Sequence, residues 1–221
     1  MRTFSDELYM AFLDRSYNLG YNAVEFQSTK QPVEFYKDKA YVCSFMPNGE
    51  FHYQSNPDVR ADVTKLSELF AEMRHAYDLY DRGQHLSFNG VENYKVLCEF
   101  GSFLLAAMKD NNEQLKFVTW SYSYDRESVA YGHYFDTDYK GARQDFAVRA
   151  GLIDEQKLFK TEDLMAIYDA CVYRAVNDEA INYKDERKLQ SLTERIEKLV
   201  PELQERNESE QEMEQDLGQE A

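Results

Sequence analysis

Basic residues are scarce in this sequence. Its 221 residues include 25 Lys and Arg against 41 Asp and Glu, which gives a formal net charge of −16. Because like charges repel, a chain this acidic is a poor ligand for phosphate backbones and for anionic lipid surfaces. The composition therefore argues against direct nucleic-acid binding and against membrane binding.

Long hydrophobic runs are also missing. The longest unbroken apolar stretch is the six residues Phe103–Met108, whereas a membrane-spanning helix needs about 20 such residues. Asp6 and Glu7 stand where a signal peptide carries positive charge and then an apolar segment. We therefore expect a cytoplasmic protein.

Cysteine is rare and widely spaced. The three cysteines (Cys43, Cys98 and Cys171) are odd in number, and none belongs to a CxxC pair. Disulfide frameworks and zinc sites need cysteines in pairs or at short ligand spacings. The sequence thus predicts reduced thiols and no metal site.

The common catalytic motifs are missing as well. The chain has no phosphate-binding Walker loop, no Gly-rich dinucleotide turn, no GxSxG nucleophile turn, no kinase motif and no HExxH zinc motif. We therefore expect no cofactor, no catalytic residue and no enzymatic activity.

The first part of the chain combines helical and β-type segments. Ser5 can cap a helix over residues 5–18, because its hydroxyl can accept a free backbone N–H. Segments of alternating polarity follow, and Asn48-Gly49 indicates a hairpin, since both residues tolerate the positive φ of a type I′ turn. Trp120, further along, is expected in the core of a second sheet.

The clearest single element is a long helix over residues 57–82. Asn56 can cap it, Pro57 suits its first turn and Gly83 ends it. Its apolar residues recur at spacings of 4, 3, 4, 3, 4 and 3 and form a heptad seam: Val59, Val63, Leu66, Phe70, Met73, Tyr77 and Tyr80. The seam could be a coiled-coil surface for a homodimer or a partner. We prefer a helix that lies across the chain's own sheet, because most apolar stripes face a core.

The second half reads as a β-meander followed by helices. Strands are predicted at 103–108, 115–124 and 128–135, and helices at about 138–150, at 162–176 after a capping Thr161, and after Asn182. Residues 84–100 show no clear periodicity. The expected fold class is α+β, with antiparallel sheets packed against helices.

Three segments are expected from this pattern. They are an N-terminal α-β-α unit at 1–84, a meander with three helices at 85–201, and an acidic tail at 202–221. The tail holds eight carboxylates and one base. It has too few apolar residues to offset its ordering entropy, so we expect disorder there.

Part of the second half resembles a known domain. The likeness covers about residues 86–200 and rests on Phe117-Val118-Thr119-Trp120, Gly132-His133-Tyr134-Phe135, Asp138-Tyr139, Asp145-Phe146-Ala147-Val148-Arg149 and Gly151-Leu152-Ile153. These residues resemble an uncharacterised accessory domain of conjugative and integrative elements from Gram-positive gut bacteria, also found in large multi-domain proteins. The resemblance implies a mobile-element setting, where anti-defence proteins are common, but no chemistry for any residue.

Tyrosine is abundant and lies close to acid. There are 17 Tyr against 14 Phe, and several Tyr crowd one segment among aspartates. Aromatic residues among basic side chains favour the binding of single-stranded nucleic acid. Aromatic residues among acidic side chains instead favour the binding of a protein partner with a basic groove. Half-buried sheet positions could also account for these tyrosines. The expected partner-binding residues are Tyr122, Tyr131, His133, Asp136, Asp138 and Tyr139.

Three functions follow in order of preference. The first is a non-enzymatic acidic protein that occupies a nucleic-acid-binding surface by DNA mimicry, as an antirestriction or anti-CRISPR inhibitor does. The second is an accessory interaction module of a conjugation apparatus, paired through residues 57–82. The third is an enzyme in which His133 transfers a proton near Asp136 and Asp138. For these two aspartates we prefer helix capping to a role in catalysis or Mg²⁺ binding.

Overall fold

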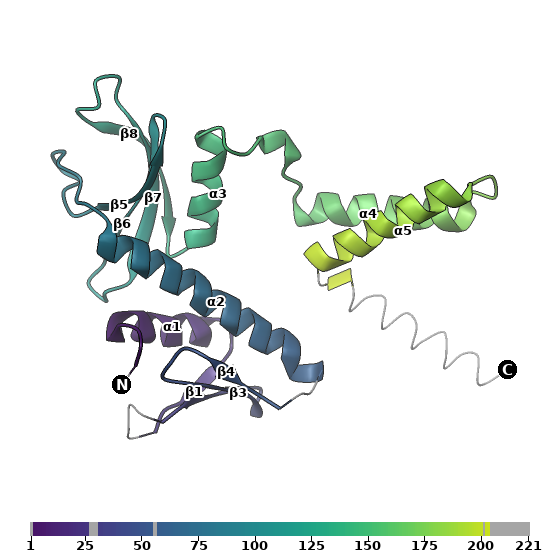
Figure 1. The fold of residues 1–221 in the computed structure, drawn as a ribbon, viewed down its shortest axis with the longest axis horizontal. Coiled ribbons are helices and arrows are strands. Elements are labelled where there is room, and N and C mark those ends of the chain that lie inside the picture. Colours follow the sequence, from purple (N-terminus) through teal and green to yellow (C-terminus); the bar gives the residue numbers. More distant parts are fainter. Residues whose placement is uncertain (1, 27–30, 55–56, 201, 204–221) are drawn as a thin grey trace. The chain divides into compact units, whose positions relative to one another are not determined.

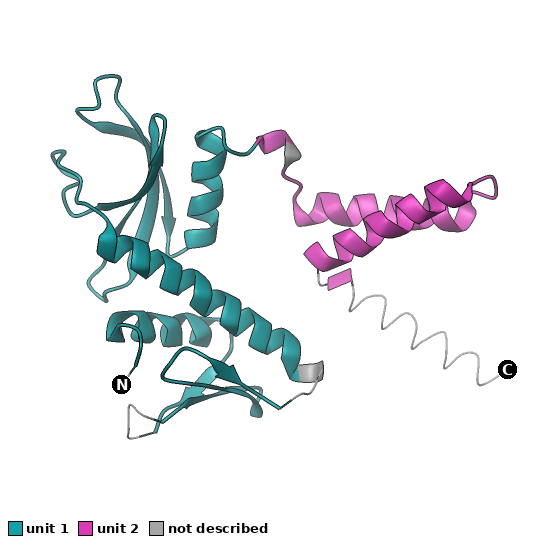
Figure 2. Cartoon of the chain, viewed as in Figure 1, with its two compact units in different colours: residues 1–153 teal, residues 154–221 magenta. Residues whose placement is uncertain are grey.

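A computed structural model describes residues 2–26, 31–54, 57–200 and 202–203. The chain forms two compact units, residues 1–153 (unit 1) and residues 154–221 (unit 2) (Figure 2). Both sheets lie in unit 1 and are antiparallel, which confirms the expected α+β class. Among the described residues, no helix is long and apolar enough to cross a membrane.

Unit 1 begins with a helix and a four-stranded sheet, which we name sheet A: α1 (Asp6–Asn18), β1 (Asn22–Val24), β2 (Val33–Lys37), β3 (Ala40–Phe45) and β4 (Phe51–His52). After the long helix α2 (Pro57–Arg82), a second sheet, sheet B, is followed by a helix: β5 (Lys95–Phe100), β6 (Phe103–Lys109), β7 (Leu115–Tyr122), β8 (Val129–Asp136) and α3 (Tyr139–Arg149). Unit 2 contains η1 (Glu155–Lys157), α4 (Thr161–Asn177) and α5 (Tyr183–Leu199).

The first helix and the β3–β4 hairpin form close to where they were expected. The Ser5 hydroxyl accepts the backbone N–H of Leu8 at 3.2 Å, as a helix cap does. In the hairpin, Gly49 donates its N–H to the carbonyl of Met46 at 2.9 Å and is the only one of the two expected turn residues with positive φ. The expected type I′ turn is therefore wrong, because Pro47 begins a three-residue loop that ends in a left-handed glycine.

Helix α2 packs against the core of its own unit. Five residues of the heptad seam are buried: Val63, Leu66, Phe70, Tyr77 and Tyr80. The Phe70 ring lies 4.7 Å from the Phe45 ring and 5.1 Å from the Phe12 ring. The seam thus faces the protein's own interior, as we preferred, and Asn56 as its cap lies outside the described residues.

One core joins the two sheets across α2 (Figure 1). Phe35 of sheet A, Leu66 of α2 and Leu105 of sheet B belong to the same buried cluster. The structure therefore divides the chain after Ile153 and not after residue 84, where the local pattern placed a boundary. The reason is that the buried seam runs along α2 from one sheet to the other. Phe70 packs on Phe45 of sheet A, and Tyr77, two turns later, donates to the carbonyl of Glu113 between β6 and β7 of sheet B.

Sheet B is a meander with one more strand than its sequence pattern suggested. Strand β5 pairs with β6 and contains a bulge between Val96 and Cys98, which interrupts its alternation. On the outer face of the sheet, Trp120 is 4% exposed and belongs to a second buried cluster with Leu86 and Val118. The expectation that Trp120 is a core residue is confirmed.

Unit 2 is a helical hairpin with a small core of its own. Helix α5 begins after Asn182, as expected, and the Asn182 side chain caps it by accepting the N–H of Asp185. Thr161 was wrongly expected to cap α4, since helix α4 begins at Thr161 and the Asp163 carboxylate accepts the N–H of Lys160 at 3.1 Å. Leu203 lies within the expected disordered tail, but it is fully buried against the helices. Residues 204–221 lie outside the described residues.

Phe70 tests which surface α2 uses. We expect Phe70→Asp to abolish folding, because it removes a ring from the aromatic cluster and leaves a buried charge without a partner. Circular dichroism checks the loss of helix. The control is Met10→Asp, at a position 62% exposed on α1, which should leave the helical signal unchanged. A folded Phe70→Asp monomer in light scattering would contradict the core assignment.

Leu203 tests how far the ordered part of unit 2 extends. We expect Leu203→Ala to lower the unfolding free energy of unit 2 by about 2–5 kcal/mol, the usual loss when a buried leucine is truncated. Hydrogen exchange of the α4 and α5 amides measures this loss. Leu199→Ala, at a position 68% exposed, serves as the control and should change little. Equal protection in both variants would show that Leu203 adds nothing to the core.

Candidate functional site

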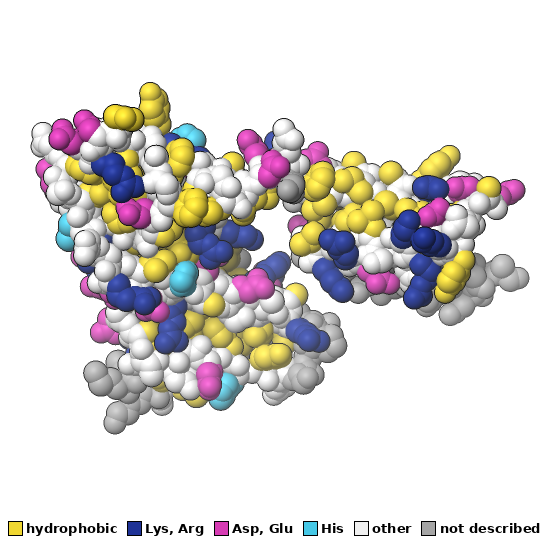
Figure 3. All heavy atoms as spheres, turned by 45° about the horizontal axis from the view of Figure 1, so that its top comes forward, with side chains coloured by type: hydrophobic (Ala, Val, Ile, Leu, Met, Phe, Trp, Pro, Cys, Tyr) yellow, Lys and Arg dark blue, Asp and Glu magenta, His cyan; other side chains and the backbone are white. Residues whose placement is uncertain are grey.

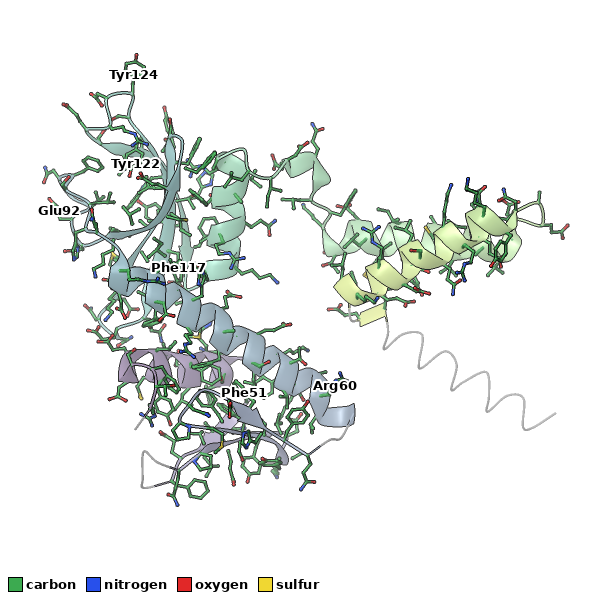
Figure 4. All side chains as sticks on the ribbon, viewed as in Figure 1. Phe51, Arg60, Glu92, Phe117, Tyr122 and Tyr124 are labelled. Carbon is green, nitrogen blue, oxygen red and sulfur yellow. The ribbon has the colours of Figure 1, made fainter. Side chains whose placement is uncertain are left out.

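The end of sheet B that holds the β7–β8 turn exposes aromatic and acidic side chains together. We name this surface the tip: Glu99, Phe100, Tyr122, Tyr124, Asp125, Glu127 and Tyr131. Tyr124 is fully exposed, Tyr131 is 82% exposed and Phe100 is 53% exposed. Figure 4 shows Tyr124 at the very end of the turn, pointing away from the sheet. Figure 3 shows carboxylates and hydrophobic side chains side by side at this end of unit 1.

Hydrogen bonds within the β7–β8 turn fix its shape and its charge. The N–H of Arg126 donates to the carbonyl of Ser123 at 2.9 Å, and the N–H of Ser123 donates to the carbonyl of Ser128 at 2.9 Å. The Asp125 carboxylate accepts the Ser123 hydroxyl and the N–H of Glu127, and these bonds hold its pKa below the usual range. Asp125 is therefore a fixed negative charge at the tip.

Tyr122 connects the tip to the edge strand β5. Its hydroxyl donates to Glu99 Oε2 at 2.8 Å, and its ring meets the Phe88 ring edge-on at 6.2 Å between centroids. Burial, followed by this hydrogen bond, raises the pKa of Tyr122 to about 12. The phenol thus stays neutral and keeps donating to Glu99 at physiological pH.

The one cation in the tip's turn is already engaged. The Arg126 guanidinium lies 4.6 Å from the centre of the Tyr122 ring and donates to the carbonyl of Gly101 at 2.6 Å. Both contacts hold the guanidinium over the base of the tip, and within the described part of the chain Arg126 forms no ion pair with Asp125 or Glu127, which are exposed.

Below the tip, a polar network joins β7, β8 and α3. The Thr119 hydroxyl, which is buried, donates to Asp145 Oδ2, and the other oxygen of Asp145 lies 2.9 Å from His133 Nδ1. Arg149 donates to the carbonyl of Thr119 at 3.0 Å and to the carbonyl of Tyr131 at 2.7 Å. The network therefore anchors the edge strand β8 to helix α3.

Strand β8 is irregular where the network holds it. Tyr131 has a φ of 53°, a left-handed conformation that is costly for a bulky side chain. A Cβ on the next residue, Gly132, would lie 2.4 Å from Trp120 Nε1, so only glycine fits there. This bulge breaks the alternation of the strand: Val129 packs on the outer cluster and Phe135 on the inner one.

The His133–Asp145 pair has the orientation of a general base and its supporting carboxylate. A carboxylate accepts hydrogen bonds, so the proton of a neutral imidazole sits on Nδ1 and Nε2 is left as the base. His133 does not line the hollow beside Phe117, the groove beside β5 or the hollow beside β4. Within the described residues, no three His, Cys, Asp or Glu side chains gather as metal ligands would.

The three cysteines are free thiols in the structure. Burial raises the pKa of Cys43 to about 12, and burial also raises the pKa of Cys98. A thiol with a raised pKa is a poor nucleophile at neutral pH.

The structure separates the six predicted binding residues. Tyr122 and Tyr131 belong to the tip, and His133 lies in the network beneath it. Asp136 lies at the other end of β8, where it pairs with Lys116 Nζ at 2.6 Å, and Asp138 caps α3 by accepting the N–H of Gly141 at 3.0 Å. The expected capping role is confirmed for Asp138 and is wrong for Asp136, which lies two residues before the cap and pairs with Lys116 instead.

Tyr139 is not a surface residue. It is 3% exposed, and its ring packs 5.1 Å from the Phe117 ring in the core between α3 and sheet B. The expectation that it contacts a partner is wrong, because the first turn of α3 faces inward at this position.

Several residues of the site were missed in the sequence. Asp145 and Arg149 stand four residues apart, a spacing typical of an ion pair on one helix face. Their real partner, Thr119, is 26 residues before Asp145, and no local pattern pairs them. Glu99 was missed because its partner, Tyr122, lies two strands away, and only the strand order of the sheet brings them together.

No family model, curated protein or solved structure matches this chain. The resemblance to a mobile-element domain therefore stays a prediction.

Arg149 tests whether the network holds β8 in place. We expect Arg149→Met to lower the free energy of unfolding by about 2 kcal/mol or more, because each hydrogen bond to a charged group contributes about 1.5–3 kcal/mol. Urea denaturation with an unchanged m value measures it. Arg143→Met on the exposed side of α3 is the control, and an equal effect of the two changes would contradict the network's role.

Proposed function

We propose that this chain is a non-enzymatic binding protein whose tip docks on a basic surface of a protein partner. The surface composition supports this proposal. Exposed tyrosines are frequent interface anchors, because the ring buries a large area while the hydroxyl keeps a hydrogen bond. Tyr124 and Tyr131 are such residues, and the bonded turn and the network below hold them in fixed positions.

The charge of the tip favours a basic partner. Glu99, Asp125 and Glu127 supply three carboxylates, and the single cation Arg126 is committed to Tyr122 and Gly101. Unit 1 as a whole has 22 Asp and Glu against 16 Lys and Arg. Such a field speeds association with a positively charged surface and repels nucleic acid.

The surface of a protein that binds nucleic acid is the basic surface that this tip fits best. In a mobile element, the partner would be a host defence protein, and the bound chain would exclude DNA from its groove as a mimic. In this proposal the carboxylates of the tip contact the partner, a role that the sequence predicted for Asp136 and Asp138. Those two aspartates are engaged by Lys116 and by the N-terminus of α3.

The accessory-module alternative loses the surface it relied on, since the seam of α2 is buried in the chain's own core. One observation favours the enzyme alternative, namely the 2.9 Å contact of His133 with Asp145. A reaction there would need a substrate held at Nε2, and turnover that disappears in His133→Gln would show it.

Capture of the partner tests the binding proposal. The full chain is immobilised at ~150 mM salt and exposed to a lysate of a Gram-positive gut bacterium. A captured protein should be displaced by duplex DNA and released as salt rises, because exposed charge pairs are screened within about 8–10 Å. The variant Tyr124→Ser with Glu127→Lys should weaken its affinity about tenfold or more, the loss typical of an anchor residue and a matched charge.

The matched control is Tyr17→Ser with Glu68→Lys, which alters the same residue types on the exposed sides of α1 and α2. It should leave capture unchanged. Equal capture by the tip variant and the control would contradict the proposal. Saturable binding of the chain itself to duplex DNA at ~150 mM salt would contradict the mimicry, because a protein that binds DNA needs exposed basic side chains and the tip has too few of them.

A further inference from the structure

A groove of about 520 Å³ runs along the outer edge of β5, behind the tip. Its floor contains Leu86 and Leu97, which are buried, and its sides contain the half-buried Leu79, Phe88 and Val96. The volume lies within the range of sites that hold a small ligand or a short peptide. Tyr122 and Glu99 close the groove at the end nearest the tip.

The opposite end of the groove carries hydrogen-bond donors. Arg82 ends helix α2 there, and only its Nε is used within the described residues, in a 2.8 Å bond to the carbonyl of Asp78. His85 Nδ1 lies 2.9 Å from the carbonyl of Glu92, so it donates that proton and its ring is held in place. Gln84 and Ser87 complete this end of the lining. The terminal N–H groups of Arg82, with the amide of Gln84 and the hydroxyl of Ser87, suit a carboxylate, whereas a neutral His85 presents only an acceptor at Nε2.

The two ends are separated along β5 by a known number of residues. A Cβ on Gly83, beside Arg82, would lie 2.5 Å from the carbonyl of Val96, which places the donor end next to Val96. Glu99 lies three residues further along the strand. At ~3.3 Å per residue, the donor end and the carboxylate end are about 10 Å apart. An extended peptide of about four residues spans that distance.

The edge of β5 is open at the same place. The segment 84–86 pairs with β5 through the bond from Val96 N to the carbonyl of Gln84, at 2.9 Å, and through the His85–Lys95 bridge. Beyond Val96, no strand among the described residues pairs with the outer side of β5. An exposed strand edge offers backbone donors and acceptors to an extended chain.

We propose that this groove binds the carboxyl-terminal peptide of a protein partner in an extended conformation. The terminal carboxylate lies against the Arg82 guanidinium, an apolar side chain rests on Leu86, Phe88 and Leu97, and a basic side chain three residues earlier pairs with Glu99. Charge complementarity fixes the direction of the peptide, because the reverse direction would put its carboxylate beside Glu99. The inference rests on the proposed function, since it names the segment that a basic partner inserts beside the tip.

A peptide library tests the groove directly. Random hexapeptides, attached to beads through their N-termini so that the carboxylate is free, are screened with the fluorescently labelled full chain. The selected peptides should share an apolar residue close to the C-terminus and a Lys or Arg three residues before the end. Resynthesis as C-terminal amides should weaken binding about tenfold or more, because a charge-assisted hydrogen bond is lost.

Two variants locate the bound peptide. Arg82→Gln should weaken binding of the free acids about tenfold and should leave the binding of the amides unchanged. Glu99→Gln, which keeps an acceptor for Tyr122, should weaken only the peptides that contain the basic residue. Arg60→Gln is the matched control and should change nothing, because Arg60 lies in the first turn of α2 and Arg82 ends the helix (Figure 4).

Failure of the screen, or equal binding of acids and amides, would overturn the groove inference and leave capture through the tip intact. A different outcome would overturn the tip proposal instead. In it, peptides bind in the groove, but the variant Tyr124→Ser with Glu127→Lys still captures the partner fully. Loss of peptide binding in Arg60→Gln as well as in Arg82→Gln would also count against the groove, since both ends of α2 would then matter equally.

Discussion

The burial of the α2 seam against both sheets, one after the other along the helix, is the constraint on which unit 1 depends. Phe70 packs into the aromatic cluster of α1 and sheet A, while Ala76 and Tyr77, less than two turns later, lie in the same continuous core with Leu105 and Phe117 of sheet B. Without this helix, part of the inner face of each sheet would be exposed to solvent. The core on the inner face of sheet B therefore fixes where the sheet lies in unit 1, and with it the position of the tip at one end of the sheet.

Sheet B combines a rigid base with an exposed end. Its inner face is covered by α2 and α3, and its outer face by the segment that carries Leu86 and Phe88. The bonds of Arg149 to Thr119 and Tyr131 fix the edge strand β8, although Tyr131 is in a costly conformation. Strain that the surroundings hold in place is typical of functional surfaces. An anchored surface loses little conformational entropy on binding, which favours recognition by the exposed tyrosines.

The acidic residues are distributed unequally along the chain, and this distribution indicates which carboxylates recognise a basic partner. Residues 204–221 contain seven acidic residues and one basic residue. Unit 1 has the same excess of six acidic residues spread over 153 residues, so its recognition of a basic partner depends on where individual carboxylates lie. Glu99 is shared by the tip and the β5 groove, and Tyr122 holds it in place with a neutral hydroxyl. One residue pair thus connects the two proposed contacts of the partner.

The sequence by itself determined the elements whose causes are local. Ser5 and Asp138 cap their helices, the heptad spacing of α2 predicted a buried helix, and alternation located the strands of the meander. Tertiary structure alone decided the bulged β5, the burial of Tyr139 and Leu203, and the meeting of Thr119, His133 and Asp145. These features depend on contacts between residues far apart in the chain. The spacing of apolar residues within a segment predicts which face of a helix or strand is buried. Which element packs against that face depends on how all the elements pack together.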